Sequence, residues 1–98
     1  MRGNTLEQFI DDLLTMGGPE KEFTYKNHRY FLETRAISET ESDMYVFEIF
    51  EDDNKDCEYL CHCIGKDFAE CVAKFEKERI FEGKTIYEAE QDIEVVFG

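Results

Sequence analysis

The sequence is poor in the residues that separate domains and has no apolar run long enough to cross a membrane. Its 98 residues include one proline and six glycines, too few for a flexible linker, so we expect a single acidic α+β domain spanning residues 1–98. A membrane span needs about 20 consecutive apolar residues. The first residues lead into an acidic segment with helical periodicity instead of an apolar signal sequence, which favours a cytoplasmic protein with reduced thiols.

Basic residues are also scarce. Eleven Lys and Arg stand against 24 Asp and Glu, which gives a formal net charge of −13. Such a charge repels nucleic-acid phosphates and anionic membranes, attracts basic protein surfaces and favours a monomer. We therefore expect no nucleic-acid partner and no membrane partner, and a basic protein is the partner class that the composition favours. Hydrophobic residues at 42% and aromatic residues at 14% are enough to build a core and argue against disorder.

The sequence contains no recognisable catalytic arrangement. His28 is placed in a turn and His62 in a strand, and no serine or cysteine lies in a strand-to-helix elbow. The two short glycine segments lack the spacing of a phosphate-binding loop. Carboxylate pairs are expected by chance among 24 acids. We therefore predict that the protein is not an enzyme and that it needs no cofactor.

The four cysteines raise the alternative of a metal or redox role. On a strand, Cys57, Cys61 and Cys63 share one face at spacings of about 7 Å, whereas a zinc ion needs ligands converging at about 2.0–2.3 Å. His62 points to the other face, Cys71 lies further along the chain, and there is no Cys-x2-Cys pair. We favour buried structural thiols and expect no bound metal.

The pattern of apolar residues predicts a helix, two β-hairpins and two further helices. The expected elements are a helix over 5–16, a first hairpin over 22–33, a loop over 39–43, a second hairpin from 44–51 and 57–64, a helix after Asp67 and a short helix after Thr85. The tail 94–97 is either the end of that helix or a short strand, and its β-branched pair favours the strand.

Local signals support several of these elements. Thr5, Asp67 and Thr85 each precede a helical pattern with Gln or Glu three residues later, which is typical of a capping box. A two-residue turn at Asn27-His28 pairs Tyr25 with Tyr30 and Phe23 with Leu32, and these four side chains then share a face. In the second hairpin, Tyr45, Phe47 and Ile49 alternate as in a half-buried strand.

The predicted fold class is therefore α+β, with the order α-β-β-β-β-α-α. We expect an N-terminal helix, a four-stranded antiparallel sheet made of two hairpins, and two C-terminal helices, with the helices packed on one face of the sheet.

Acidic residues concentrate between positions 39 and 58. This stretch has nine acids and one base, Lys55, for a net charge of −8, whereas residues 20–38 have three acids and four bases, for a net charge of +1. We interpret the stretch as a docking surface for a basic partner. The candidate site residues are Glu39, Glu41, Asp43, Glu51, Asp52, Asp53, Asp56 and Glu58.

These observations favour a non-enzymatic acidic protein-binding module, and an inhibitor, an immunity protein or a nucleic-acid mimic is a sharper form of that hypothesis. Two alternatives stay open: a small metal- or redox-linked protein that uses the cysteines, and an accessory protein whose acidity serves solubility only.

Two segments resemble small acidic bacterial proteins of unknown function. Residues 81–89, FEGKTIYEA, look like the dGKs-hydrophobic-x-E ending of that family, and residues 23–31, FTYKNHRYF, are similar to its F-x-Y-x-G-x-x-Y hairpin, with Asn27 in place of the glycine. The shared motifs are a turn and two helix caps. The resemblance implies a similar fold and assigns no activity and no site residue.

Overall fold

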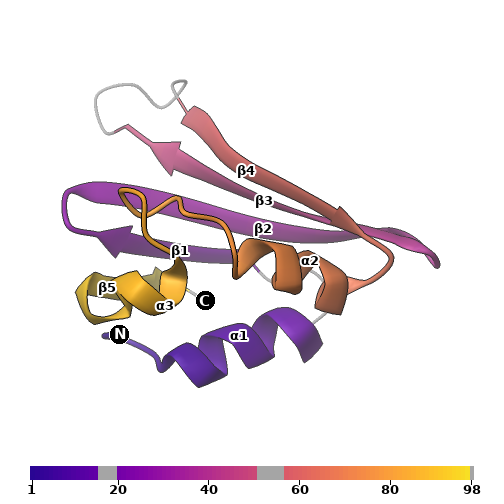
Figure 1. Ribbon diagram of the computed structural model, residues 1–98, viewed down its shortest axis with the longest axis horizontal. Coiled ribbons are helices and arrows are strands. Elements are labelled where there is room, and N and C mark those ends of the chain that lie inside the picture. Colours follow the sequence, from indigo (N-terminus) through magenta and orange to yellow (C-terminus); the bar gives the residue numbers. More distant parts are fainter. Residues whose placement is uncertain (16–19, 51–56, 98) are drawn as a thin grey trace.

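The structure is a computed structural model that describes residues 1–15, 20–50 and 57–97 (Figure 1). Its elements, in order, are α1 (Leu6–Thr15), β1 (Glu20–Tyr25), β2 (His28–Ser38), β3 (Glu41–Ile49), β4 (Cys57–Gly65), α2 (Phe68–Phe75), α3 (Ile86–Ala89), the 3-10 helix η1 (Glu90–Asp92) and β5 (Ile93–Phe97). Within these residues no helix is long and apolar enough to cross a membrane.

The described strands form one antiparallel sheet with the order β4-β3-β2-β1-β5. The α+β class and the order of the first seven predicted elements are confirmed, and the prediction of a four-stranded sheet is wrong. The fifth strand is the C-terminal segment, where Ile93 pairs with Tyr25 and Val95 with Phe23. Because α3 has only four residues, the chain turns back early enough to pair with β1.

The first hairpin has its turn one residue earlier than predicted. Tyr25 pairs with His28 and Phe23 with Tyr30, so the two turn residues are Lys26 and Asn27. Lys26 takes the left-handed φ of 53° that a tight hairpin turn requires. The pairing changes by two residues, which preserves the face of each side chain, and Phe23, Tyr25, Tyr30 and Leu32 are buried on one face as expected.

The predicted loop over 39–43 is wrong. Strand β2 continues to Ser38, the turn contains Glu39 and Thr40, and β3 begins at Glu41. Polar and acidic residues at 41–43 suggested a loop, but Ser42 and Asp43 are buried: Arg35 on β2 binds the Asp43 carboxylate, and the Cys71 thiol on α2 donates to the Ser42 carbonyl. Buried hydrogen bonds allow polar residues in a strand that composition alone would reject.

The predicted helix caps are confirmed at their N-terminal residues. Thr5 Oγ1 accepts from the Gln8 amide at 3.1 Å, Asp67 from the Glu70 amide at 2.9 Å, and Thr85 forms a complete capping box with Glu88. The predicted box is incomplete at the other two helices: at α1 the Gln8 side chain donates to Asp12 at 2.7 Å, and at α2 only the bond from the Glu70 amide to Asp67 is formed.

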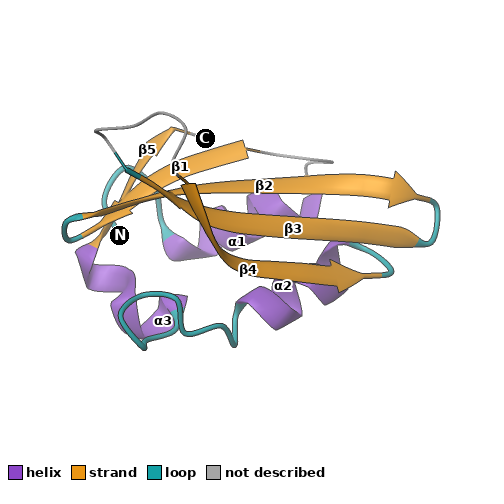
Figure 2. Ribbon diagram, turned by 90° about the horizontal axis from the view of Figure 1, so that it is seen from above, coloured by secondary structure: helices purple, strands orange, loops and turns teal. Residues whose placement is uncertain are grey.

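The helices α1, α2 and α3 all lie on the same side of the sheet (Figure 2). Their inward residues include Phe9, Leu13, Val72, Phe75 and Ile86. Helix α1 is also tied to β1 by a buried ion pair: Lys21 is 1% exposed, lies 3.1 Å from Asp12, and its ammonium group is 5.0 Å from the centre of the Phe9 ring. Hydrogen bonds from Gln8 and then Lys21 lower the pKa of Asp12.

The centre of the core is an aromatic cluster around Phe81. This residue lies in the turn between α2 and α3, and its ring centre is 6.1 Å from that of Phe23, 5.6 Å from Tyr25 and 5.4 Å from Tyr30. Phe81 is fully buried. A residue that the sequence places in a turn therefore joins the β1–β2 hairpin to the C-terminal third of the chain.

We expect Phe81→Ala to lower the free energy of unfolding by about 3–5 kcal/mol, because it removes a fully buried aromatic ring and leaves a cavity. Urea unfolding followed by circular dichroism measures the change. The exposed Lys84 in the same turn is the control, and Lys84→Ala should change the free energy of unfolding by less than about 0.5 kcal/mol. Similar losses in the two variants would contradict this packing.

Candidate functional site

The acidic residues proposed as a docking surface do not lie together. Glu39 and Glu41 are exposed at the β2–β3 turn, whereas Glu58 is exposed on β4, opposite Glu48. Glu41 and Glu48 are at opposite ends of β3, about 23 Å apart at 3.3 Å per residue. Four further candidates, Glu51, Asp52, Asp53 and Asp56, lie outside the described residues.

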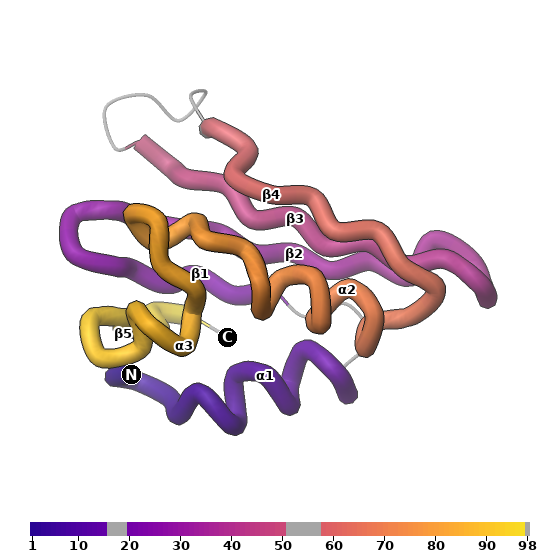
Figure 3. Tube along the Cα trace, in the orientation of Figure 1, coloured from indigo at the N-terminus to yellow at the C-terminus, as the bar shows by residue number. Residues whose placement is uncertain are grey.

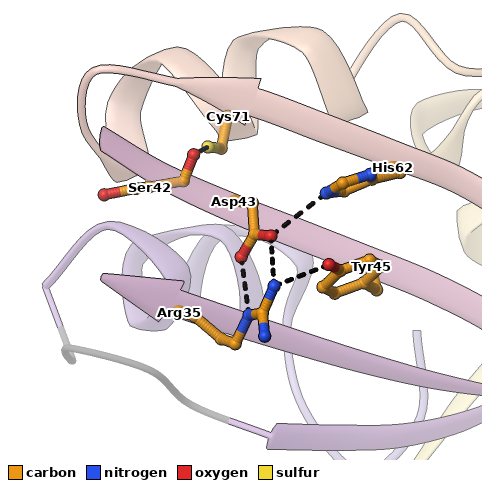
Figure 4. A network of polar contacts seen from close by, with 6 residues as sticks. All are labelled: Arg35, Ser42, Asp43, Tyr45, His62 and Cys71. Carbon is orange, nitrogen blue, oxygen red and sulfur yellow. Dashed lines mark hydrogen bonds and ion pairs between the residues drawn. The ribbon is translucent and has the colours of Figure 1, made fainter. Parts of the chain in front are cut away.

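Asp43, one of the acidic residues proposed as a docking surface, is buried. It is 1% exposed, and its carboxylate is held by side chains of two neighbouring strands (Figure 4). Arg35 donates to both oxygens, from Nε at 3.0 Å and from Nη2 at 2.7 Å, and His62 Nε2 lies 3.1 Å from Oδ2. Arg35 Nη2 also donates to the Tyr45 hydroxyl at 2.6 Å. A carboxylate with these partners is a structural clamp and is not available for docking.

The clamp explains the ionisation of Asp43. The Arg35 guanidinium, with smaller contributions from His62 and Tyr45, lowers the pKa of this carboxyl to about 2. An ionised carboxylate only accepts hydrogen bonds, so His62 Nε2 must carry the proton that joins the two groups. The histidine ring is held further by stacking on Tyr45, with ring centres 4.1 Å apart. The cluster fixes the orientation of the imidazole.

The face of the sheet that points away from the helices, here called the open face, carries an aromatic patch. Its members are Phe31, Tyr45, Phe47, Tyr59 and His62. They form continuous contacts across three strands: Phe31 to Phe47 at 5.2 Å, Phe47 to Tyr59 at 5.9 Å and Tyr45 to Tyr59 at 5.7 Å between ring centres. Tyr59 is 67% exposed. No helix of the described residues covers this face (Figure 2).

Two carboxylates next to the aromatic patch face each other. Glu20 on β1 pairs with Glu33 on β2, and Glu33 pairs in turn with Tyr45. Like charges directly opposite on neighbouring strands repel. The arginines of the open face form their ion pairs with other acids: Arg29 binds Glu22 at 2.9 Å and Arg35 binds Asp43, so Glu33 has only a longer-range attraction to Arg35. Within the described residues neither Glu20 nor Glu33 has an ion pair.

The aromatic patch was not identified from the sequence. The predicted half-buried set Tyr45, Phe47 and Ile49 lies on the open face, and it is Met44 and Val46 that face the helices. A signal was present, because residues 44–47 and 30–32 are apolar at successive positions, which places apolar side chains on both faces of a strand. When the helices cover only one face of a sheet, such a pattern indicates that the other face is apolar as well.

The described cysteine side chains lie on the helix side of the sheet. Cys63 and Cys71 are buried, and Cys61 is half-buried. The Cys71 thiol donates to the Ser42 carbonyl at 3.4 Å, and burial raises its pKa. A hydrogen bond with the Cys63 thiol, together with burial, raises the pKa of Cys61. The described residues contain no group of three or more His, Cys, Asp or Glu side chains that could hold a metal ion.

Two hollows lie away from the aromatic patch. One of about 530 Å³ runs along the outer side of α1, beside Glu7, Ile10 and Asp11. The other, of about 420 Å³, lies beside Arg2, Lys26 and Asp92. Neither is lined by a histidine, cysteine or serine.

Comparisons of this chain with family models, with curated proteins and with solved structures find no match. Any statement about function therefore depends on the arrangement of the residues themselves.

The first prediction from this site concerns the Asp43 clamp. Asp43→Asn should lower the free energy of unfolding at pH 7 by about 2 kcal/mol, because the ionised carboxylate is stabilised only in the folded state. The pKa of Asp43 is lower in the folded than in the unfolded protein, so the folded state binds fewer protons. The contribution of Asp43 is therefore complete above about pH 4 and is lost as the pH falls towards 2.

Urea unfolding of wild type and Asp43→Asn at several pH values between 3 and 7 tests this dependence, since the gap between the two should shrink as the pH falls. Glu41→Gln, at an exposed acid of the same strand, provides the control and should stay within about 0.5 kcal/mol of wild type. A gap that does not change with pH would show that the Asp43 carboxylate is not clamped.

The second prediction concerns the thiols. Cys63 and Cys71 should react with iodoacetamide at least about 100 times more slowly in the folded than in the urea-unfolded protein, because they are buried and react only on opening. Mass mapping of labelled peptides measures each rate. A cysteine introduced at an exposed turn position by Thr40→Cys is the matched control and should react at the unfolded rate. Equal labelling of Cys71 and of position 40 in the native state would exclude buried thiols.

Proposed function

We propose that the protein is a non-enzymatic, cytoplasmic binding module that docks a basic protein on the open face of its sheet. The observation that carries the proposal is the aromatic patch next to the facing carboxylates Glu20 and Glu33. Aromatic side chains supply contact area at low entropic cost, and the two carboxylates supply the charge that selects the partner.

The contacts of the open face support a basic partner over a second copy of the chain. A second copy would place another Glu20–Glu33 pair and a further charge of −13 against the first. An arginine or lysine side chain from a basic partner would instead separate the two carboxylates and lie over the neighbouring aromatic rings. Each such cation would pair directly with carboxylates that form no ion pair within the described residues.

Among the sharper forms of this function, an inhibitor or immunity protein has more support than a nucleic-acid mimic. A mimic needs carboxylates in a regular row, and the described acids at 39, 41 and 58 lie at opposite ends of the sheet. An apolar sheet face with carboxylates beside it resembles a protein–protein interface, in which a polar rim surrounds an apolar centre.

A charge-reversal experiment tests the proposal with a fluorescent nona-arginine peptide as the probe. Glu20→Lys/Glu33→Lys should weaken binding by about tenfold or more at low salt, because it removes both carboxylates and introduces repulsion. Fluorescence anisotropy gives the dissociation constant, and the difference from wild type should decrease as salt is raised.

The matched control is Glu7→Lys/Asp11→Lys on the outer side of α1, which changes the net charge by the same amount at two exposed positions. It should weaken binding by less than about threefold, since these charges are distant from the open face. Equal losses of affinity in both double variants would mean that the acidity acts only through net charge. That result is expected for an accessory protein whose acidity serves solubility only.

The aromatic contribution is tested by Tyr59→Ser with Tyr87→Ser as its control. Both tyrosines are exposed, by 67% and 51%, and Tyr87 lies on α3. Loss of Tyr59 should raise the dissociation constant for nona-arginine by about threefold to tenfold, and loss of Tyr87 should leave it unchanged. Indistinguishable affinities would remove the aromatic patch from the docking surface.

A further inference from the structure

The two edge strands of the sheet differ in whether another segment of the chain pairs with them. Strands β5 and β4 are the outer strands. At β5 the N-terminal segment closes the edge: the Arg2 amide donates to the Ile93 carbonyl at 2.9 Å, and the Val95 amide donates to the Arg2 carbonyl at 2.8 Å. Figure 3 shows the N-terminus beside β5. Gly3 permits this approach, because a Cβ there would lie 2.4 Å from the Val95 oxygen.

At β4 no further strand of the described residues pairs with the outer edge, where the Ile64 carbonyl is bound by the Lys74 side chain. Within the described residues, β3 is the only element whose backbone pairs with β4. The strand has nine residues, and its sequence CEYLCHCIG contains no proline, lysine or arginine, the residues that usually protect an edge from pairing. A bulge at Leu60 is the one irregularity in its pairing with β3.

A contact from α2 shows which backbone groups face outward. The Lys74 ammonium donates a hydrogen bond to the Ile64 carbonyl oxygen. In an antiparallel pair the amide and carbonyl of one residue point to the same side, and successive residues alternate. Ile64 therefore faces away from β3, and His62 does so as well. The backbone of His62 and the amide of Ile64 are placed to pair with an added strand.

The side chains of β4 connect this edge to the open face. Tyr59, His62 and Ile64 all lie on that face, and Ile64 is 47% exposed. A strand added to β4 would lie about 4.8 Å away. Its outward side chains would then continue the rows that end at Tyr59 and His62, so backbone pairing and aromatic contact would act on the same segment.

The charges near β4 select a basic segment. Glu58 is exposed and faces Glu48 across the strands; Glu48 is paired with His28 Nδ1 at 2.8 Å, whereas Glu58 has no ion pair within the described residues. The negative charge of Glu78 acts on both Cys61 and Cys63, and the Lys74 ammonium lies at the far end of the strand, on the Ile64 carbonyl. A second copy paired along β4 would bring these carboxylates against their own copies, whereas lysine or arginine side chains would neutralise them.

We propose that β4 accepts an extended basic segment of the partner as an additional strand of the sheet. This inference rests on the proposed function, because it describes how the basic protein that docks on the open face is held. Main-chain hydrogen bonds at His62 and Ile64 supply affinity. Alternate side chains of the bound segment point to the same face of the sheet, and their positive charge gives the specificity.

The test uses a capped octapeptide of alternating lysine and valine, and a twin of the same sequence in which every backbone nitrogen is methylated. The twin keeps the charges and side chains but cannot donate to β4. We expect the unmethylated peptide to bind at least about tenfold more tightly, and to slow amide exchange at His62 and Ile64 by about tenfold or more while the twin does not. Equal affinity of the two peptides, or no protection of these amides, would overturn strand addition.

A pair of variants tests the same contact from the side of the protein. Ile64→Pro removes an amide that faces away from β3, so the ladder to β3 is kept, and Ile64→Ala removes the side chain alone. The proline variant should bind the peptide at least about tenfold more weakly than the alanine variant. Equal binding by two folded variants would contradict the proposal, and if the proline variant does not fold, the methylated peptide decides.

Further outcomes separate this inference from the docking function. If both peptides bind equally and shift the resonances of Tyr45 and Phe47, the open face docks basic segments and strand addition is wrong. If neither peptide binds, strand addition is also wrong, and the nona-arginine titration of the open-face variants decides the docking function separately. If the protein alone forms dimers in sedimentation with protected amides at His62 and Ile64, the occupant of the edge is a second copy, and the assignment to a basic segment fails.

Discussion

Every strand of the sheet presents alternate side chains to two faces, and the helices α1, α2 and α3 cover one of them (Figures 1 and 2). Phe23, Tyr25 and Tyr30 point to the covered face and build the core around Phe81. Phe31 and Phe47 point the other way and retain an apolar surface that the chain itself does not bury. The exposed aromatic patch is thus a direct consequence of packing a sheet of this length with helices of ten, eight and four residues.

The electrostatics follow the same division. Several of the few basic residues bind nearby acids: Lys21 binds Asp12 between α1 and β1, Arg29 binds Glu22, and Arg35 binds Asp43. These pairs fix elements against one another and neutralise several of the few positive charges. The carboxylates that remain without such partners, including Glu20 and Glu33, then set the character of the open face.

The two edges of the sheet that border the open face differ from each other. At β5 the N-terminal segment occupies the edge, whereas β4 presents the backbone of His62 next to the side chain that is stacked on Tyr45. The aromatic patch and the unpaired backbone therefore meet along β4. Gly65 helps to keep this arrangement, because a Cβ there would lie 2.8 Å from Glu70 Cβ and would push the start of α2 away from the strand.

Local features of the fold could be predicted from the sequence because their causes are local. The caps at Thr5, Asp67 and Thr85 depend on residues three positions apart; each N-cap side chain accepts the expected amide, and the full capping box forms at Thr85. The class, the order of the first seven elements and the burial of Phe23, Tyr25 and Tyr30 depend on periodicity. A register error of two residues leaves the face of each side chain unchanged.

Other features depended on contacts between residues distant in the chain, and only the tertiary structure decided them. Asp43 is an exposed loop acid by composition, yet Arg35 and His62 from neighbouring strands bury it within β3. The tail could be helix or strand until β1 offered it a free edge. Which face of β3 meets the helices is equally undetermined by its own residues, because Met44–Phe47 are apolar at both alternations. The sequence by itself determined the first seven elements in their order and the acidity. The pairing of distant strands decided which acids are buried and which face is left open, since burial depends on what packs against a residue and not on the residue alone.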